Sequence, residues 1–543
     1  MLELRKDIFA DERDDNLKEI GKPTQRQDMI GHVTGTTAYF DDHKLAGMLH
    51  LKVLRSPHHH ARIRRIDTSE AERSGGVRRI IRGADVPRNL NTLLSLLNFG
   101  KDDEPSLATD KVRYKGEPIV AIVANTEREA FEALTKVRVD YEQLTPVFDV
   151  EEALKPGAPV VNETYPKNTF EYHGKYDHQR LRFGDVEQAF ASADHVLEQR
   201  YQMSPIEHAP TETNGSIAAP EANNRFVVYT CAQGLFFSLD TTAKILDVPS
   251  NKLHFIGGTV GGGFGGKVDS LTEPLVTLAA MLTGRPVRYV LGREDEMQFG
   301  SPRGAERIYV KDAVMRDGRV TARQVRSYFD SGAYTRLSSY AVIKCAAHIP
   351  GPYTIPNVHA DIYCVYTNRV PATAMRGFGV TAVDFALECQ MDKLAHLIGM
   401  DPMEFRILNA YRDGDMKAHR REAKNTALIE CVQVAAEKAK WPIRDEYKRM
   451  SSRLGGGGAR AAIPQTKLDG GLQAPARAAQ QRTSYDRPLS PPVVPPQPAR
   501  PAAFEPPRPT APPTPPPPAP PSPPANVQHG AARFSSVFGT RRR

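Results

Sequence analysis

The chain of 543 residues is poor in cysteine, with five residues that stand far apart in the sequence. None of them forms a C-x-x-C pair, which excludes a zinc finger and a disulfide framework. An ordinary iron–sulfur cluster needs four thiolates, so two clusters would exceed the supply and one would lack the usual close spacing. Any iron–sulfur chemistry connected with this chain must therefore reside on another polypeptide.

Long apolar runs are also missing. No stretch approaches the ~18 residues that a membrane-spanning helix needs. The N-terminal sequence MLELRKDIFADERDD has no apolar core of a secretory signal peptide. The sequence predicts no membrane span and a cytoplasmic location.

The positive charge of the chain, formally +8, is confined to one end. Residues 451–543 hold 12 basic and 3 acidic residues, which leaves 60 basic and 61 acidic residues for 1–450. The longer part thus has a net charge of −1, and the sequence predicts no nucleic-acid binding.

Residues 451–543 also hold 22 of the 44 prolines, in runs such as PPTPPPPAPPSPP. A segment with so few large apolar residues cannot offset its ordering entropy, so we expect a disordered tail with polyproline II stretches. Its composition is typical of GC-rich DNA read in a wrong frame from about Gly455, which indicates a tail without an evolved function. The alternative is an interaction scaffold, because PxxP runs bind SH3-like partners.

Before the tail, apolar patterns predict a mixed α/β protein with two domains. Residues 1–26 form an N-terminal extension, and the first domain spans 27–147. A linker at 148–181 leads to a second domain at 182–450.

Periodicity in apolar residues predicts the individual elements. The first domain contains expected strands at 48–56, 61–67, 115–124 and 137–144. A helix at 126–137 begins with Thr126 as N-cap, and Glu129 completes a capping box. In the second domain the expected strands are 195–202, 216–220, 225–230, 252–256 and 287–291. The expected helices there are 235–247, 269–284 and 381–399, with another starting at Asp401-Pro402.

The most informative stretch is a glycine-rich loop, GGGFGGK, at residues 261–267. It follows a predicted strand and leads into the predicted helix 269–284. Glycines allow positive φ and close approach of another molecule, and free N–H groups at a helix start favour an anion. We therefore expect this loop to contact a ligand.

Two nucleotide-binding patterns match the loop incompletely. G-x-G-x-x-G runs from Gly261 to Gly266, but the acid that a dinucleotide site wants is late, at Glu294. G-x-x-x-x-G-K-[ST] matches through Lys267, but Val268 stands where a hydroxyl must bind Mg²⁺. A nucleotide-binding α/β protein and a purely structural turn stay open as alternatives.

With Phe264 at its centre, the loop resembles that of the xanthine dehydrogenase/aldehyde oxidase family of molybdenum hydroxylases. The resemblance spans about residues 20–412 and includes, in order, EHAPTETNGSIA, CAQGLFFSLDTTAKILDVP, GGGFGGK, PATAMRGFG and DPMEFRILN. Residues 34–63 resemble the family's N-terminal hammerhead domain, so that 27–147 would be this domain and 182–450 the first molybdopterin-binding domain. The chain then looks like a large subunit.

The resemblance implies a cofactor and an electron path. Molybdenum would sit on a pterin dithiolene, as the cytosine dinucleotide form in a bacterium, with oxo, sulfido and hydroxide ligands. The hydroxide attacks an electron-poor carbon, with water as the oxygen source. Electrons would leave through [2Fe-2S] clusters on an iron–sulfur small subunit to FAD on a medium subunit.

The resemblance also assigns residues to the cofactor, namely Gln233, Gly263, Phe264, Gly265, Arg376 and Gly377. Phe264 and Gly265 would direct backbone N–H groups toward the oxo ligand of the metal, and Gln233 would donate a hydrogen bond to the same oxo. Arg376 would bind near the molybdenum through the cofactor, because a guanidinium is suited to anion recognition.

Three further residues would face the substrate. Phe378 would stack on a flat ring. Purine-oxidising members carry a glutamate where this chain has Val268, and an arginine where an ungapped alignment places Lys344. Because Val268 offers a purine no hydrogen bond, the expected substrate is an aldehyde or an aromatic N-heterocycle.

The family's general base has no counterpart in this sequence. It is a glutamate in a G-x-G-E context within a second molybdenum domain, which should follow near residue 455 together with a Q-G-x-G loop. Glu505 is the only glutamate there, in a proline tract. We assign no catalytic residue and expect a truncated large subunit that is inactive by itself.

The histidines suggest no metal site. His58, His59 and His60 are adjacent in an extended segment, so their side chains cannot converge easily, and a loop with solvated imidazoles is expected. His208 is expected to orient a turn.

Overall fold

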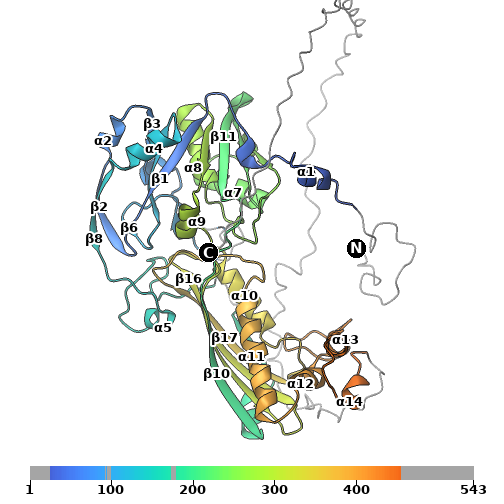
Figure 1. Ribbon diagram of the computed structural model, residues 1–543. Helices are drawn as coiled ribbons and strands as arrows, with labels where there is room; N and C mark the ends of the chain where they lie inside the picture. The colour runs from blue at the N-terminus through green and yellow to red at the C-terminus, as the bar shows by residue number, and fades with distance from the viewer. Residues whose placement is uncertain (1–24, 92, 94–99, 173–178, 454–543) are drawn as a thin grey trace, which may run out of the picture. The chain divides into compact units, whose positions relative to one another are not determined.

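The computed structural model describes residues 25–91, 93, 100–172 and 179–453, whose arrangement Figure 1 shows. The predicted extension, except for its last two residues, and the predicted tail, except for its first three, lie outside the described residues. The described part is mixed α/β, as the sequence predicts. It contains no helix long and apolar enough to cross a membrane.

A seven-stranded sheet combines strands from both predicted domains in the order β13-β12-β11-β14-β1-β7-β3. These strands are β1 (Leu49–Arg55), β3 (Val77–Ile81), β7 (Pro118–Ala124), β11 (Gly215–Glu221), β12 (Arg225–Thr230), β13 (Leu253–Gly257) and β14 (Val287–Val290). β1 pairs with β14 in parallel, with Leu49 opposite Val287. The domain boundaries stay a prediction, but the two segments share one sheet.

The local signals in the first segment are confirmed. Every residue of β7 is buried, as its continuous apolar run predicts. The helix α4 (Glu127–Leu134) begins with the predicted capping box, in which Glu129 N donates to Thr126 Oγ1 and Thr126 N to Glu129 Oε2. Smaller sheets combine β2 (Ala61–Asp67), β6 (Lys111–Val112) and β8 (Arg138–Gln143), and β4 (Leu90–Asn91) with β5 (Glu104–Pro105).

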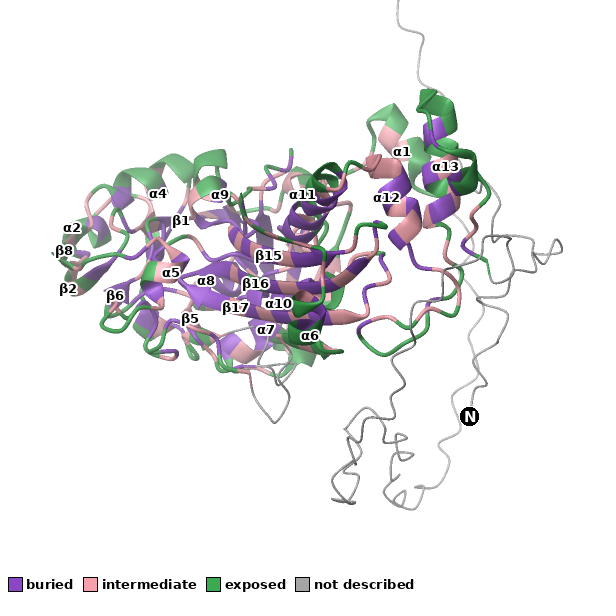
Figure 2. Ribbon diagram, turned by 90° about the horizontal axis from the view of Figure 1, so that it is seen from below, coloured by how far each residue is buried: buried purple, intermediate pink, exposed green. Residues whose placement is uncertain are grey.

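A second sheet has five strands in the order β10-β15-β16-β17-β9. Its strands are β9 (Arg180–Phe183), β10 (His195–Met203), β15 (Glu306–Val314), β16 (Val320–Gly332) and β17 (Asn357–Tyr366). The helices α10 (Ser338–His348) and α11 (Thr381–Leu397) lie along this sheet (Figure 1). Figure 2 shows buried residues along β15, β16 and β17, and exposed residues on the outside of α4.

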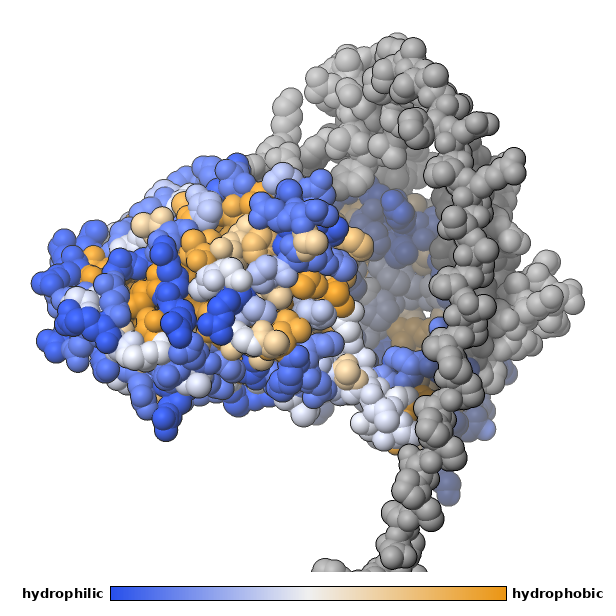
Figure 3. Space-filling model, turned by 90° about the horizontal axis from the view of Figure 1, so that it is seen from above, coloured by the Kyte–Doolittle hydropathy of each residue, from blue (hydrophilic) through white to orange (hydrophobic). Residues whose placement is uncertain are grey.

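The remaining helices connect or cover these sheets. They are α1 (Met29–Thr34), α2 (Ser69–Glu72), α5 (Val150–Ala153), α6 (Val186–Ala191), α7 (Leu235–Leu246), α8 (Glu273–Thr283), α9 (Arg293–Phe299), α12 (Pro402–Asn409), α13 (Leu428–Ala439) and α14 (Asp445–Lys448). On the face seen in Figure 3, patches of apolar residues interrupt the hydrophilic surface.

Several residues of the segment predicted as a linker are buried in the core. Val161, Tyr165 and Phe170 are buried, and Tyr165 stacks on Tyr366 with ring centroids 5.1 Å apart. Its large apolar residues therefore contribute to the core, and the bounds of the linker stay a prediction.

Candidate functional site

The glycine-rich loop does not lead directly into a helix. α8 begins at Glu273 rather than near residue 269, and residues 268–272 separate it from Lys267. The first position of α8 carries a buried carboxylate, Glu273, which accepts a hydrogen bond from Thr230 Oγ1 at 2.7 Å. The expectation that the loop amides occupy a helix start is therefore wrong.

Gln233 holds the loop from the segment before α7. Its Oε1 accepts hydrogen bonds from Gly265 N at 2.9 Å and from Lys267 N at 3.3 Å, and its own N donates to Lys267 O at 2.7 Å. Within the described residues its Nε2 has no partner, and the residue is exposed. The amide therefore has a fixed orientation, with its donor side available to a ligand.

The geometry changes one detail of the predicted cofactor contact. Gly265 N is occupied by Gln233, so it is not the amide that faces outward. In the part of the chain that the structure describes, Gly263 N and Phe264 N donate to no acceptor. Phe264 has a positive φ of 52° and is 47% exposed.

Two glycines are required by close contacts. A Cβ on Gly263 would lie 2.4 Å from Gln233 Cδ, and one on Gly265, where φ is +104°, would lie 2.5 Å from Ala374 O. No side chain can be added at either position without moving Gln233 or the neighbouring backbone. The two glycines thus allow the loop 261–267 to pack closely against the segment that carries Gln233 and against the segment 371–379.

Lys267 is buried in an ion pair, although a phosphate-binding loop needs this residue free. Its Nζ lies 2.9 Å from Glu212 Oε2, and its side chain is 0% exposed. The same oxygen accepts from Gly261 N at 2.7 Å, while Glu212 Oε1 is buried with no partner among the described residues. This pair ties both ends of the loop to one carboxylate and argues against the nucleotide-binding alternative.

The segment 371–379 lies against the loop. Arg376 N donates to Phe264 O at 2.7 Å, and the exposed Arg376 guanidinium makes no ion pair or hydrogen bond in the described part of the chain. The buried Arg303 donates to the carbonyl oxygens of Arg376 and Gly377. His208 Nε2 lies 2.9 Å from Ala374 O in this segment, and the same ring packs against Gly266 of the loop, where a Cβ would lie 2.9 Å from Nδ1.

The three predicted substrate residues lie around one small apolar cluster. Val268 and Phe378 pack with Tyr340 against the buried Leu93 and Leu337. The ring centroids of Tyr340 and Phe378 are 5.9 Å apart. Lys344 Nζ lies 5.2 Å from the Tyr340 ring centroid, which places a cation at the border of the cluster.

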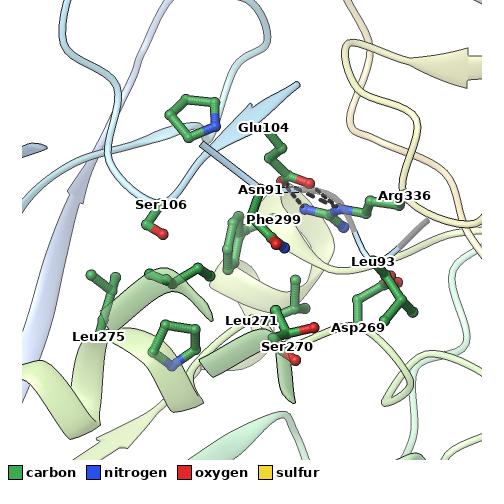
Figure 4. A pocket seen from close by; sticks show the side chains of 14 residues that line it. Asn91, Leu93, Glu104, Ser106, Asp269, Ser270, Leu271, Leu275, Phe299 and Arg336 are labelled. Carbon is green, nitrogen blue, oxygen red and sulfur yellow. Dashed lines mark hydrogen bonds and ion pairs between the residues drawn. The ribbon is translucent and has the colours of Figure 1, made fainter. Parts of the chain in front are cut away.

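A cavity of about 60 Å³ adjoins this cluster, with Leu93 in both (Figure 4). On its wall, Arg336 Nη2 lies 2.9 Å from Glu104 Oε1, as the dashed lines show. Burial raises the pKa of Asp269, which also lines the cavity, although the charge of Arg336 opposes this shift. The cavity has room for a few water molecules at most.

Two other candidate metal-binding groups are unsuited to that role. Burial raises the pKa of Cys231, two residues before Gln233, to about 12, so its thiol stays protonated. His60 is buried, with Nδ1 2.8 Å from Thr145 O, and the expectation of three solvated imidazoles is wrong for this residue. The described residues contain no group of three or more His, Cys, Asp or Glu placed to hold a metal ion.

Sequence reasoning missed Glu212 and Arg303. Glu212 lies in the motif EHAPTETNGSIA. An acidic residue next to a turn in this motif was the signal that could have identified it. Arg303 lies in no recognised motif, and its role depends on contacts with residues 73 and 74 positions away.

Family models match both parts of the chain. Residues 161–410 match the molybdopterin cofactor-binding domain, and residues 34–145 match the hammerhead domain of aldehyde oxidase and xanthine dehydrogenase. The chain is also 33% identical to the nicotinate dehydrogenase large molybdopterin subunit of Eubacterium barkeri, over 77% of this chain and 96% of that subunit.

The chain belongs to the xanthine dehydrogenase/aldehyde oxidase family of molybdenum hydroxylases.

Other family members are longer than the matched region. A probable xanthine dehydrogenase subunit from Bacillus subtilis is 34% identical over 73% of this chain and 52% of its own length. The structure of the aldehyde oxidoreductase from Desulfovibrio gigas matches with a TM-score of 0.72 and 31% identity, over 78% of this chain and 47% of that one. The chain thus spans about half the length of these two relatives.

Proposed function

We propose that this chain carries part of the molybdopterin site of an enzyme that oxidatively hydroxylates an aldehyde or an aromatic N-heterocycle. The observation that carries the proposal is the joint attachment of Gln233 and Arg376 to the loop 261–267. Each of them keeps an unused donor there, and the N–H group of Phe264 adds a third.

These residues fit an anionic metal–oxo cofactor. The available groups are the Gln233 amide, the Phe264 N–H and the Arg376 guanidinium, all of which are donors. Preorganised donors stabilise negative charge that develops on an oxygen without adding an ionisable acid. At Gly263 and Gly265 there is no room for a side chain, so glycine is needed at both positions for these groups to lie close together.

When bound, the cofactor would supply an activated hydroxide from water and accept the electron pair of the oxidised C–H bond. Gln233 and Phe264 would hold its oxo oxygen, and Arg376 would bind its anionic part. Phe378 would support a flat substrate from the apolar cluster, next to Val268. Lys344, at the border of the cluster, would receive a polar substituent of the substrate.

The general base is proposed to come from outside the described residues. Glu212, the carboxylate that holds the loop, is committed to Lys267 and Gly261. Removal of a general base lowers rates by roughly 10²–10⁴-fold. The described region by itself should therefore turn over slowly or not at all.

Electron transfer requires partners in this proposal. Cys231, Cys345 and Cys364 are buried, which leaves Cys389 and Cys431, fewer than the four thiolates that a cluster needs. An iron–sulfur subunit and an FAD subunit would accept the electrons, and the cofactor would be the cytosine dinucleotide form in a bacterial host.

The direct test measures molybdenum and pterin in the purified full-length protein, produced with its partner subunits. Gln233→Ala should lower the molybdenum content at least tenfold, because it removes the support of the loop and one donor. Gln188→Ala on the exposed side of α6 is the matched control and should keep its molybdenum. Full molybdenum content in Gln233→Ala would refute the assignment.

The nucleotide-binding alternative predicts a different ligand. Titration of the same preparation with ATP and NAD should give no binding, because Lys267 is already paired. Tight binding of either nucleotide that Lys267→Met abolishes would favour the alternative.

A further inference from the structure

The segment 371–379 is held by two buried side chains that lie far from it in the sequence. Arg303 is 6% exposed, and the His208 side chain is 0% exposed. The two residues are also connected to each other through the backbone, because Arg303 N donates to Ile206 O at 2.9 Å, two positions before His208. Neither residue belongs to the proposed cofactor and substrate contacts.

Both side chains donate to backbone carbonyl groups of the segment. Arg303 Nη1 donates to Gly377 O at 3.1 Å, and its Nη2 donates to Arg376 O. His208 Nε2 lies 2.9 Å from Ala374 O, and this nitrogen is the donor because a carbonyl oxygen only accepts. In the part of the chain that the structure describes, Arg376 O and Ala374 O accept no other hydrogen bond.

The Arg303 guanidinium is a buried charge without an ion pair among the described residues. Burial lowers the pKa of Arg303, and the charge of Glu306 opposes this shift. A guanidinium nevertheless stays protonated in proteins, and a buried charge without an ion pair lowers stability. What an arginine offers in return is its planar fork, which reaches two successive carbonyl groups in a fixed geometry.

These contacts determine the direction of the peptide N–H groups. In a trans peptide the N–H points opposite to the carbonyl, so the bond from Arg303 to Arg376 O turns Gly377 N away from Arg303. The bond to Gly377 O does the same for Phe378 N. Neither N–H has an acceptor within the described residues, and Gly377 is exposed. Its φ is +79°, and successive N–H groups around a left-handed residue form an anion-binding concavity.

We propose that Arg303 and His208 are positioning residues for the molybdopterin site, an inference that rests on the proposed function. They hold the carbonyl groups of the segment 371–379 on its buried side. The guanidinium of Arg376 and the N–H groups of Gly377 and Phe378 thereby face the anionic cofactor. The Phe378 ring is placed toward the substrate by the same contacts.

Arg303→Lys separates positioning from the presence of a buried cation, because lysine keeps the charge but has no fork for two carbonyl groups. Amide hydrogen exchange is measured on the full-length protein purified with its partner subunits. We expect exchange in residues 371–379 to become at least tenfold faster, and exchange in β16 to stay unchanged. Arg326→Lys, at an exposed position on β16, is the control and should match the wild type in both regions. Unchanged exchange in 371–379 of Arg303→Lys overturns the proposal.

Kinetics per bound molybdenum atom distinguish positioning from a purely structural role. A purely structural variant contains fewer loaded molecules, but those that are loaded keep the wild-type KM. With benzaldehyde as the substrate, we expect Arg303→Lys to raise KM at least fivefold, because the Phe378 ring is displaced. A wild-type KM in the loaded molecules of Arg303→Lys overturns the positioning role.

Two variants of His208 keep the proposal falsifiable where Arg303→Lys does not fold. His208→Gln retains a donor for Ala374 O and should keep slow exchange in residues 371–379, whereas His208→Leu should accelerate it at least fivefold. Equal exchange in the two variants overturns the proposal. Wild-type protein without molybdenum would contradict the proposed function, whereas molybdenum-loaded wild type with unchanged exchange in the variants would contradict only this inference.

Discussion

Two buried ion pairs, Arg323–Asp312 and Lys267–Glu212, lie in different parts of the molecule and serve different purposes. Arg323 and Asp312 face each other on the neighbouring strands β16 and β15. Both side chains are 0% exposed and share two hydrogen bonds, of 2.9 and 3.0 Å. Lys267 and Glu212 share one contact of 2.9 Å and join a loop to a residue 55 positions away.

The difference lies in how completely each pair is satisfied. The remaining Arg323 nitrogen reaches the carbonyl oxygens of Ile349 and Pro350 at 3.4 Å. Glu212 keeps one buried oxygen without a partner in the described part of the chain. The fully satisfied pair Arg323–Asp312 stabilises the sheet. The pair Lys267–Glu212 instead positions the loop, and the unsatisfied Glu212 oxygen makes this pair less stabilising.

The largest expected effect comes from breaking the pair in the sheet. Asp312→Ala leaves Arg323 charged and buried, and should lower the free energy of unfolding by about 3–5 kcal/mol. Urea unfolding followed by circular dichroism measures this loss. Glu132→Ala, which breaks the exposed pair with Arg128, is the control and should leave stability unchanged. A loss below about 1 kcal/mol for Asp312→Ala would contradict the role given to this pair.

The corresponding change at the loop should act on the cofactor more than on stability. Glu212→Gln keeps an oxygen for Gly261 N but removes the charge opposite Lys267, and should cost about 1–3 kcal/mol of stability. Molybdenum content should fall at least tenfold. The double variant Glu212→Gln/Lys267→Met removes the buried charge, so stability should recover in part while molybdenum should not. Recovery of both would mean that the pair only stabilises the fold.

An effect of similar size is expected beside the loop, at Val268. A purine edge buried against Val268 loses a hydrogen bond, at about 1–3 kcal/mol, which corresponds to ~5- to 150-fold in specificity. In the enzyme assembled with its partner subunits, Val268→Glu should raise kcat/KM for purines relative to aldehydes by this factor. The ratio is the correct readout, because the change also perturbs Lys267. An unchanged ratio would remove Val268 from the substrate pocket.

A different kind of effect, a pH dependence of stability, concerns a buried carboxylate that has no ion pair of its own among the described residues. Burial raises the pKa of Glu306 to about 8, with Arg303 and Ser327 opposing the shift. The folded state therefore binds this proton more tightly than the unfolded state, and stability falls as pH rises from about 4.5 to 8. The slope is about 1.4 kcal/mol per pH unit for one proton. Glu306→Gln should flatten the pH dependence of urea unfolding in this range, and an unaltered slope would refute it.

The sequence was sufficient for the local elements of the first segment and for the family, but it did not predict β9, β15, β16 and β17, four of the five strands of the second sheet. The apolar run of β7 and the capping box at Thr126 depend on residues that are close in the chain, and both are present as predicted. The motifs around GGGFGGK identify the family because they occur together in order, and the family models match the same regions. The individual site assignments stay predictions.

The tertiary structure decided how the site is held. From the sequence, Lys267 was available to bind a phosphate, whereas in the structure it is paired with Glu212. The orientation of the Gln233 amide is likewise set by the structure, in which two loop N–H groups donate to its oxygen. The unpaired Nε of Arg303 likewise appears only when residues 73 and 74 positions away are placed next to it. Local patterns report on backbone preference and amphipathicity, whereas the partner of a buried charge or amide is selected by the packing of distant segments.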